Sequence, residues 1–166
     1  MTPETFTDAI ALLKADHRKV EGLFEKFEGS KGQSKQAIAE QICNELKIHA
    51  TIEEEVFYPA LKGKIDDGLL SEAYVEHDGA KVLINDIMAG GPDDEFYDAK
   101  VKVLSEDIEH HVKEEEQPSE GMFAQARQAQ VDLVALRDQM LARKKQLMAQ
   151  LETEGLPPAQ LAVVQD

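Results

Sequence analysis

Histidine and glutamate recur at a fixed spacing in two distant parts of this chain. His49 precedes Glu53 by four residues, and His111 precedes Glu115 by four residues. On an α-helix, side chains four residues apart lie one above the other on the same face. Each pair therefore presents an imidazole and a carboxylate in the same direction, and iron, manganese and zinc accept both kinds of donor.

A single histidine precedes each pair, so the pattern forms an internal repeat. His17 lies 32 residues before His49, and His77 lies 34 residues before His111. The fifth histidine, His110, is the only one outside the repeat. A lone histidine on an apolar helix face is usually a hydrogen-bonded core residue, but a repeated set of potential metal donors is a much stronger signal.

Apolar residues recur every three or four positions around these histidines, which predicts amphipathic helices packed in a bundle. The stripe on the first helix contains Ile10, Leu13, His17, Val20, Phe24 and Phe27. Similar stripes predict helices at about 34–60, 69–89 and 93–116, each with a repeat histidine on its inward face. We find no segment with the two-residue period of a strand, so the predicted fold class is all-α.

Short turns containing glycine or proline separate these helices, so we predict an antiparallel, up-down-up-down four-helix bundle. Residues 131–152 predict an additional C-terminal helix, which either packs outside the bundle or forms the surface of a homodimer. The bundle domain is then expected to span residues 1–155, followed by a loose C-terminal tail at 156–166. Thr5 or Thr7 is the expected cap of the first helix.

The apolar spacing also separates candidate ligands from their neighbours. His111 keeps the step of three and four residues, whereas His110 points about 100° away and is expected to flank the site. Glu53 and Glu115 hold inward positions, although the other glutamates in their acidic runs are expected to be solvated. Glu21 follows the first histidine by four residues but lies beside an inward valine, so it is only a reserve ligand.

The inward faces of the four helices bring six donors together: His17, His49, Glu53, His77, His111 and Glu115. Burial of these groups without partners would be very costly. Two metal ions remove that cost if one takes the first two histidines, the other takes the last two, and both glutamates bridge. We therefore predict a dinuclear site typical of non-haem iron or manganese. A mononuclear zinc or manganese site and a metal-free helical interaction module are the alternatives.

Charge and composition exclude several other classes of protein. The chain has 33 acidic and 18 basic residues, a formal charge of −15, which argues against a nucleic-acid partner. Cys43 is the single cysteine, so no intrachain disulfide can form. We see no secretory signal and no apolar run long enough to span a bilayer, so we expect a cytoplasmic protein without a membrane partner.

The residues around the donors resemble the hemerythrin-like (HHE cation-binding) family. The resemblance rests on Asp16-His17-Arg18, the segment from His49 to Pro59, Glu76-His77, and His110-His111 with Glu115, and it extends over about residues 5–150. It implies a four-helix bundle that holds two iron ions, often joined by an oxo or hydroxo bridge. The implied function is oxygen, nitric oxide or redox sensing, or iron handling. An enzyme that consumes peroxide or activates oxygen is the alternative, and either would take a small diatomic or peroxide ligand.

Two positions depart from the family pattern. Oxygen-carrying members have a second histidine four residues after the one on the third helix, and here that position is Lys81. A protonated amine is not a ligand, so one iron is expected to lack a protein donor. The segment Gln117-Pro118-Ser119 also interrupts the sequence after the last glutamate motif. Both departures argue against reversible oxygen carriage and favour activation of oxygen or peroxide, or binding of nitric oxide.

Overall fold

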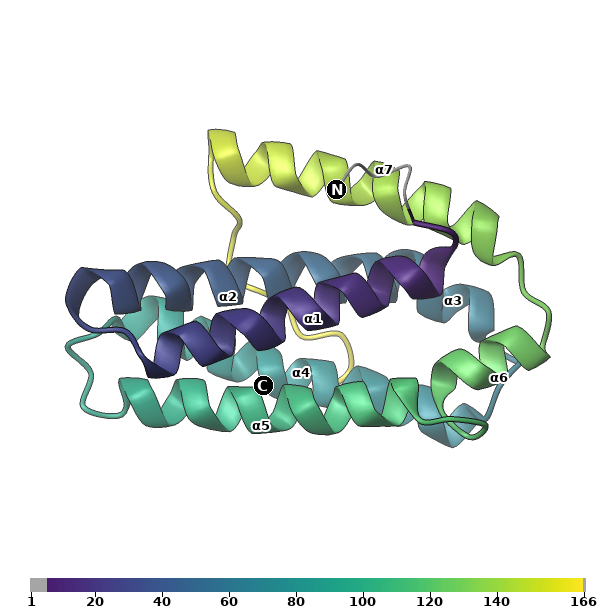
Figure 1. The fold of residues 1–166 in the computed structure, drawn as a ribbon, viewed down its shortest axis with the longest axis horizontal. Coiled ribbons are helices and arrows are strands. Elements are labelled where there is room, and N and C mark those ends of the chain that lie inside the picture. The colour runs from purple at the N-terminus through teal and green to yellow at the C-terminus, as the bar shows by residue number, and fades with distance from the viewer. Residues whose placement is uncertain (1–5, 166) are drawn as a thin grey trace.

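The structure, a computed structural model, describes residues 6–165 and is built from helices (Figure 1). The long helices are α1 (Ala9–Glu28), α2 (Gly32–Ile52), α4 (Asp67–Gly90) and α5 (Tyr97–Glu116). They form the antiparallel, up-down-up-down bundle that the sequence predicted, and residues 6–165 contain no strand. None of the helices within residues 6–165 combines the length and the apolar character of a membrane span.

Shorter elements extend the bundle at one end. A π-helical turn, η2 (Glu53–Phe57), and a short helix, α3 (Tyr58–Leu61), continue α2. Helix α6 (Met122–Gln128) follows α5, and α7 (Leu133–Thr153) then lies along the outside of α1 and α2 (Figure 1). Helix α7 is the additional C-terminal helix predicted at 131–152, and its apolar side chains pack into the core next to α1 and α2. The alternative of a homodimer surface stays a prediction.

Aspartate side chains begin three of these helices. Asp8 caps α1, since its Oδ1 accepts a hydrogen bond from the backbone of Ala11 at 2.9 Å. Asp66 and Asp132 cap α4 and α7 in the same way. The cap of α1 was expected one position earlier, at Thr7, or at Thr5, which lies outside the described residues. A carboxylate is an equally good acceptor for the free amides of a first turn.

The π-turn after α2 changes which side chains face the core. The sequence predicted Val56 and Ala60 on the inward face, but both are only half-buried, whereas Tyr58 is fully buried. In η2 the backbone N–H of Tyr58 donates to the carbonyl of Glu53, five residues earlier. The extra residue in this turn rotates the following side chains by about 100°. Tyr58 therefore points in the same direction as Glu53.

Two apolar clusters fill the bundle, one toward each end. The first includes Ile10, Leu13, Ile52, Phe57 and Leu61. The second includes Val20, Phe24, Ile42, Ile84 and Leu104. The repeat histidines lie between the clusters along the helices, because His17 follows Leu13 of the first cluster and precedes Val20 of the second. The core is therefore apolar at both ends and polar in a layer between them.

The segment after α7 corrects the expectation of a loose tail. It contains no helix, but it crosses back over α2 and α4 (Figure 1). Asn85 exchanges two hydrogen bonds of 2.9 Å with the backbone of Ala159. Asp78, which is fully buried, accepts hydrogen bonds of 2.7 to 2.8 Å from the backbone amides of Ala162, Val163 and Val164. Side chains of α4 thus hold residues 156–165, while Asp166 lies outside the described residues.

Gly121 lies against the end of α5 without room for a side chain. An added Cβ would lie 2.5 Å from the carbonyl oxygen of Gln117 and 2.9 Å from that of Glu115. We expect Gly121→Ala to lower the free energy of unfolding in urea by about 1–3 kcal/mol, because the backbone must shift. Gly22→Ala is the control, since a Cβ there meets nothing within 4 Å and alanine suits a helix interior. Equal losses in the two variants would contradict this prediction.

Candidate metal centre

The six side chains predicted as metal ligands meet in the middle of the bundle, in two groups. One group contains His17, His49 and Glu115, and the other contains Glu53, His77 and His111. In each group one donor atom from every residue lies within 4.8 Å of the others. All six residues are at most 7% exposed. The grouping has the same two histidine pairs that the sequence analysis predicted.

The two glutamates lie between the histidine pairs. Glu53 Oε1 is 3.0 Å from Nε2 of His49 and 3.1 Å from Nε2 of His77. Glu115 reaches the other two histidines, with Oε1 3.2 Å from His17 Nε2 and Oε2 3.3 Å from His111 Nε2. Each carboxylate therefore contacts one histidine of each pair, which is the placement that a bridging carboxylate requires.

Each histidine turns Nε2 toward this centre and Nδ1 toward a further carboxylate. The four contacts to Nδ1 are Asp16 to His49 at 3.0 Å, Glu54 to His77 at 2.7 Å, Glu76 to His111 at 2.7 Å, and Glu116 to His17 at 2.6 Å. Such a carboxylate fixes the imidazole ring and raises its basicity as a metal ligand. We call Asp16, Glu54, Glu76 and Glu116 the orienting carboxylates.

The sequence pattern did not mark the orienting carboxylates as functional. Glu54 and Glu116 belong to acidic runs that were expected to be solvated, but each is more than four-fifths buried. Their positions follow the internal repeat, because Asp16 and Glu76 precede a repeat histidine while Glu54 and Glu116 follow a glutamate predicted to bridge. An acidic neighbour at the same place in both halves of the repeat was the available signal.

Tyr58 brings a phenol to the centre through the π-turn. Its hydroxyl donates a hydrogen bond to Glu115 Oε2 at 2.8 Å and lies 3.2 Å and 3.3 Å from Nε2 of His77 and His111. Burial and the nearby carboxylates of Glu115 and Glu53 raise the pKa of this phenol well above its usual value. Tyr58 therefore stays protonated at neutral pH and acts as a donor.

Helix α6 closes one side of the centre. The ring of Phe123 stacks on the imidazole of His17, with centroids 5.9 Å apart and planes 9° from parallel. Phe57 from η2 packs edge-on against Phe123, with centroids 5.8 Å apart. This aromatic wall holds water away from the first histidine pair.

A cavity of about 30 Å³ adjoins the four histidines. Its apolar wall includes Val20, Leu46, Ala80, Ile84 and Ile108. A space of this size accepts a water or a diatomic molecule. Lys81 also lines the cavity, but its amine bonds to Glu54 at 2.9 Å and to Asp78 at 3.3 Å. The lysine at the position of the family's extra histidine is therefore held by carboxylates.

Protonated histidines balance the negative charges of the carboxylates in the centre. Burial lowers the pKa of His49, but the carboxylates of Glu53 and Asp16 outweigh burial and raise it to about 10. Burial raises the pKa of Glu115, but His111 and His17 outweigh burial and hold the pKa of that carboxyl well below its usual range. Imidazolium and carboxylate groups therefore attract each other here, and bound metal cations would replace the protons.

Five buried nitrogen and oxygen atoms in the centre make no well-formed hydrogen bond among residues 6–165, although four of them lie in the imidazole–carboxylate contacts of 3.0 and 3.2 Å given above. They are Nε2 of His17 and His49, both carboxylate oxygens of Glu53, and Oε1 of Glu115. Buried polar atoms normally have partners, and each one left without a partner costs about 1–3 kcal/mol. All five belong to predicted ligands, and imidazole nitrogen with carboxylate oxygen suits iron, manganese or zinc. These residues therefore fit a pair of metal ions.

Comparison with known proteins gives the family. The family model of the hemerythrin HHE cation-binding domain matches residues 8–126. The chain belongs to this family. The matched region contains all six predicted ligands and the four orienting carboxylates, and it ends before α7. The sequence-based recognition of a hemerythrin-like protein is thereby confirmed.

Two relatives place this hemerythrin-like chain among known proteins. The crystal structure of a hemerythrin HHE cation-binding domain-containing protein from Mycobacterium kansasii shares its fold, with a TM-score of 0.72 and 23% identity over 90% of this chain and 95% of that one. A DNA nickase from Nostoc sp. is 33% identical over 106 residues, which are 63% of this chain and 30% of the nickase. The hemerythrin-like chain thus matches less than a third of that longer relative.

Loss of an orienting carboxylate is expected to weaken metal binding by this hemerythrin-like chain. We predict that Glu116→Ala lowers the affinity for Fe²⁺ roughly 10–100-fold, because the His17 ring loses its acceptor. Anaerobic titration of the metal-free protein with Fe²⁺ measures the effect. Glu109→Ala on the same helix is the control, since Glu109 is exposed and its ion pair among the described residues is with Lys113. Equal affinities for the two variants would show that the carboxylate does not support a ligand.

Proposed function

We propose that this hemerythrin-like protein binds two iron ions in its bundle core and uses them to sense or handle oxygen, nitric oxide or peroxide. The observation that carries the proposal is the contact of Glu53 and Glu115 with one histidine of each pair. Two histidine pairs joined by two carboxylates suit two ions better than one. Cation binding is the property that names the family, whereas iron and the sensing role are our proposal.

Each ion would take one histidine pair, and both would share the two glutamates. The pairs are His17 with His49 and His77 with His111. When bound, a pair of iron ions supplies electrons and open coordination positions for a small ligand. The chain itself supplies the apolar cavity that admits only a small molecule, and the Tyr58 hydroxyl that donates a hydrogen bond into the centre. Manganese and zinc are the alternative occupants.

Tyr58 favours a second candidate function, an enzyme that consumes peroxide. A buried phenol that stays protonated within hydrogen-bond distance of the ligand set can donate a hydrogen bond to the negative charge that develops as peroxide reacts. Disproportionation of two hydrogen peroxide molecules into two water molecules and one oxygen molecule needs no further reactant. Oxygen release that falls in Tyr58→Phe, with iron content unchanged, would support the enzyme over a sensor or carrier.

Metal content is the direct test of the dinuclear proposal. We expect protein purified without chelator and then loaded with Fe²⁺ to hold two iron ions per chain. His111→Ala and Glu53→Ala remove ligands, so both are expected to hold less metal and to lose the near-ultraviolet iron absorption. One zinc ion per chain, or no bound metal, would overturn the di-iron proposal and favour the mononuclear or metal-free alternatives.

The cavity wall gives a separate prediction about the small ligand. Ala80 lines the cavity and is buried, so Ala80→Leu would fill much of its volume of about 30 Å³. We expect this variant to keep its iron but to lose the spectral change that nitric oxide causes in the iron-loaded protein. Val82→Leu on the exposed face of the same helix is the control. An unchanged response in Ala80→Leu would show that ligands reach the irons elsewhere.

A further inference from the structure

A basic side chain lies behind each orienting carboxylate. The four contacts are Lys144 to Asp16 at 2.6 Å, Lys81 to Glu54 at 2.9 Å, Arg18 to Glu116 at 2.8 Å and His110 to Glu76 at 3.3 Å. Each ligand histidine is therefore followed by a carboxylate and then by a basic group. Arg18 and His110 lie on α1 and α5 within the bundle. Lys144 lies on α7, after residue 126, and Lys81 lies on α4 but bonds to Asp78, which holds the C-terminal segment.

Helix α7 supplies the basic group behind His49. The Lys144 amine bonds to Asp16 Oδ1 at 2.6 Å, and Asp16 Oδ2 lies 3.0 Å from His49 Nδ1. Asp16 is 7% exposed, so its charge needs both partners. Helix α7 follows the region that matches the family model, which ends at residue 126. A residue outside the matched domain thus acts on a ligand in the first metal group.

The C-terminal segment reaches the other metal group through α4. Asp78 accepts backbone hydrogen bonds from residues 162–164 and also bonds to the Lys81 amine at 3.3 Å. Lys81 in turn donates to Glu54 Oε1 at 2.9 Å, and Glu54 Oε2 lies 2.7 Å from His77 Nδ1. These hydrogen bonds therefore form one continuous chain from the C-terminal segment to a predicted ligand.

The same region covers one side of the centre. A groove of about 400 Å³ lies between α2, α7 and residues 156–160. Lys81 and Ala50 line both this groove and the cavity beside the histidines. Lys81 thus stands between the groove and the cavity, where the position of its side chain affects both.

We propose that Lys81 and Lys144 are positioning residues for the metal centre, held in place by the C-terminal segment and by α7, with one lysine acting on each metal group. The inference rests on the proposed binding of metal at the six ligands. On this proposal, side chains and backbone groups after residue 126 also support the predicted ligands, in addition to the family domain at 8–126. The region after residue 126 then controls how firmly the metals are held and how easily they are reduced.

The physical effect of each lysine has two parts. Its charge keeps the orienting carboxylate turned toward the histidine, because a buried carboxylate without that partner would turn toward water. Only the orienting carboxylate separates its positive charge from a predicted ligand histidine, so this charge would favour the more reduced, less positive state of bound metal ions. Removal of the lysine charge should therefore accelerate metal loss and lower the midpoint potential together. A lysine that serves only packing would change neither property when methionine replaces it.

The test uses the full-length, iron-loaded protein and the variants Lys144→Met and Lys81→Met. We expect iron release to an external chelator to accelerate about three- to tenfold in each, less than for loss of an orienting carboxylate itself. We also expect the midpoint potential to shift downward. Lys144→Arg keeps the charge and should restore both properties. Lys144 is half-buried on α7, outside the four-helix core, so its variants test the proposal even if Lys81→Met fails to fold.

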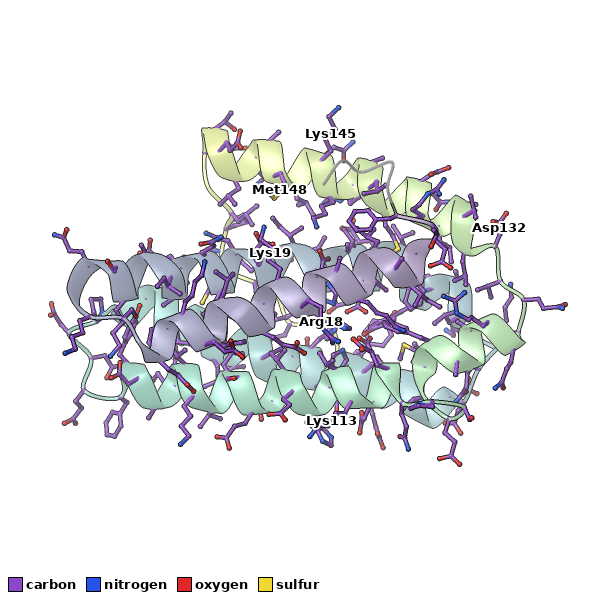
Figure 2. All side chains as sticks on the ribbon, in the orientation of Figure 1. Arg18, Lys19, Lys113, Asp132, Lys145 and Met148 are labelled. Carbon is purple, nitrogen blue, oxygen red and sulfur yellow. The ribbon has the colours of Figure 1, made fainter. Side chains whose placement is uncertain are left out.

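Two neighbours of Lys144 on α7 are matched controls. Arg143→Met removes an ion pair between α7 and the bundle, at 3.0 Å to Glu55, which is not an orienting carboxylate. Lys145→Met removes the same charge from a side chain that points away from the bundle (Figure 2). If Lys144→Met matches these controls in release rate and potential, the inference is wrong while metal binding stands. If the unaltered protein binds no metal, the proposed function fails first.

Discussion

The burial of six ionisable side chains in one layer is the constraint on which the rest of this structure depends. Apolar clusters fill both ends of the bundle, so the layer between them is shielded from water on two sides. Imidazoles and carboxylates at that depth are stable only with partners of opposite charge. The protein meets this requirement with ion pairs inside the layer and with orienting carboxylates behind every histidine.

The orienting carboxylates also join the helices to one another. Asp16 on α1 holds a histidine of α2, and Glu76 on α4 holds a histidine of α5. Glu54 connects η2 to α4, and Glu116 connects α5 to α1. The contacts therefore run once around the bundle and repeat after two helices, as the sequence repeat does. Rotation of any one helix would break two of them, so the layer that needs the partners also fixes the packing of the bundle.

The sequence pattern predicts correctly those properties that belong to a single helix. The step of three and four residues shows which face is inward, so it distinguished His111 from His110 and identified six side chains that the structure brings together. It failed where a contact joins two helices or depends on main-chain bonding. Glu54 looks the same as any solvated glutamate until α4 is beside it, and the π-turn that buries Tyr58 leaves no periodic signal. The anchoring of the C-terminal segment by Asp78 is likewise a contact between distant residues.

The number of residues in the π-turn determines which side chain after η2 faces the candidate metal centre. An α-helical path through Glu53–Phe57 needs one residue fewer, and on that path the phenol of Tyr58 would turn away from the predicted ligands. Substitution at position 58 can remove the phenol, but it cannot turn a neighbouring side chain toward the centre. Insertion or deletion of a single residue can do so, because it moves every later side chain of α3 to a new face. Diversification of this centre among related chains is therefore expected to proceed through changes of length at this turn as well as through changes of residue.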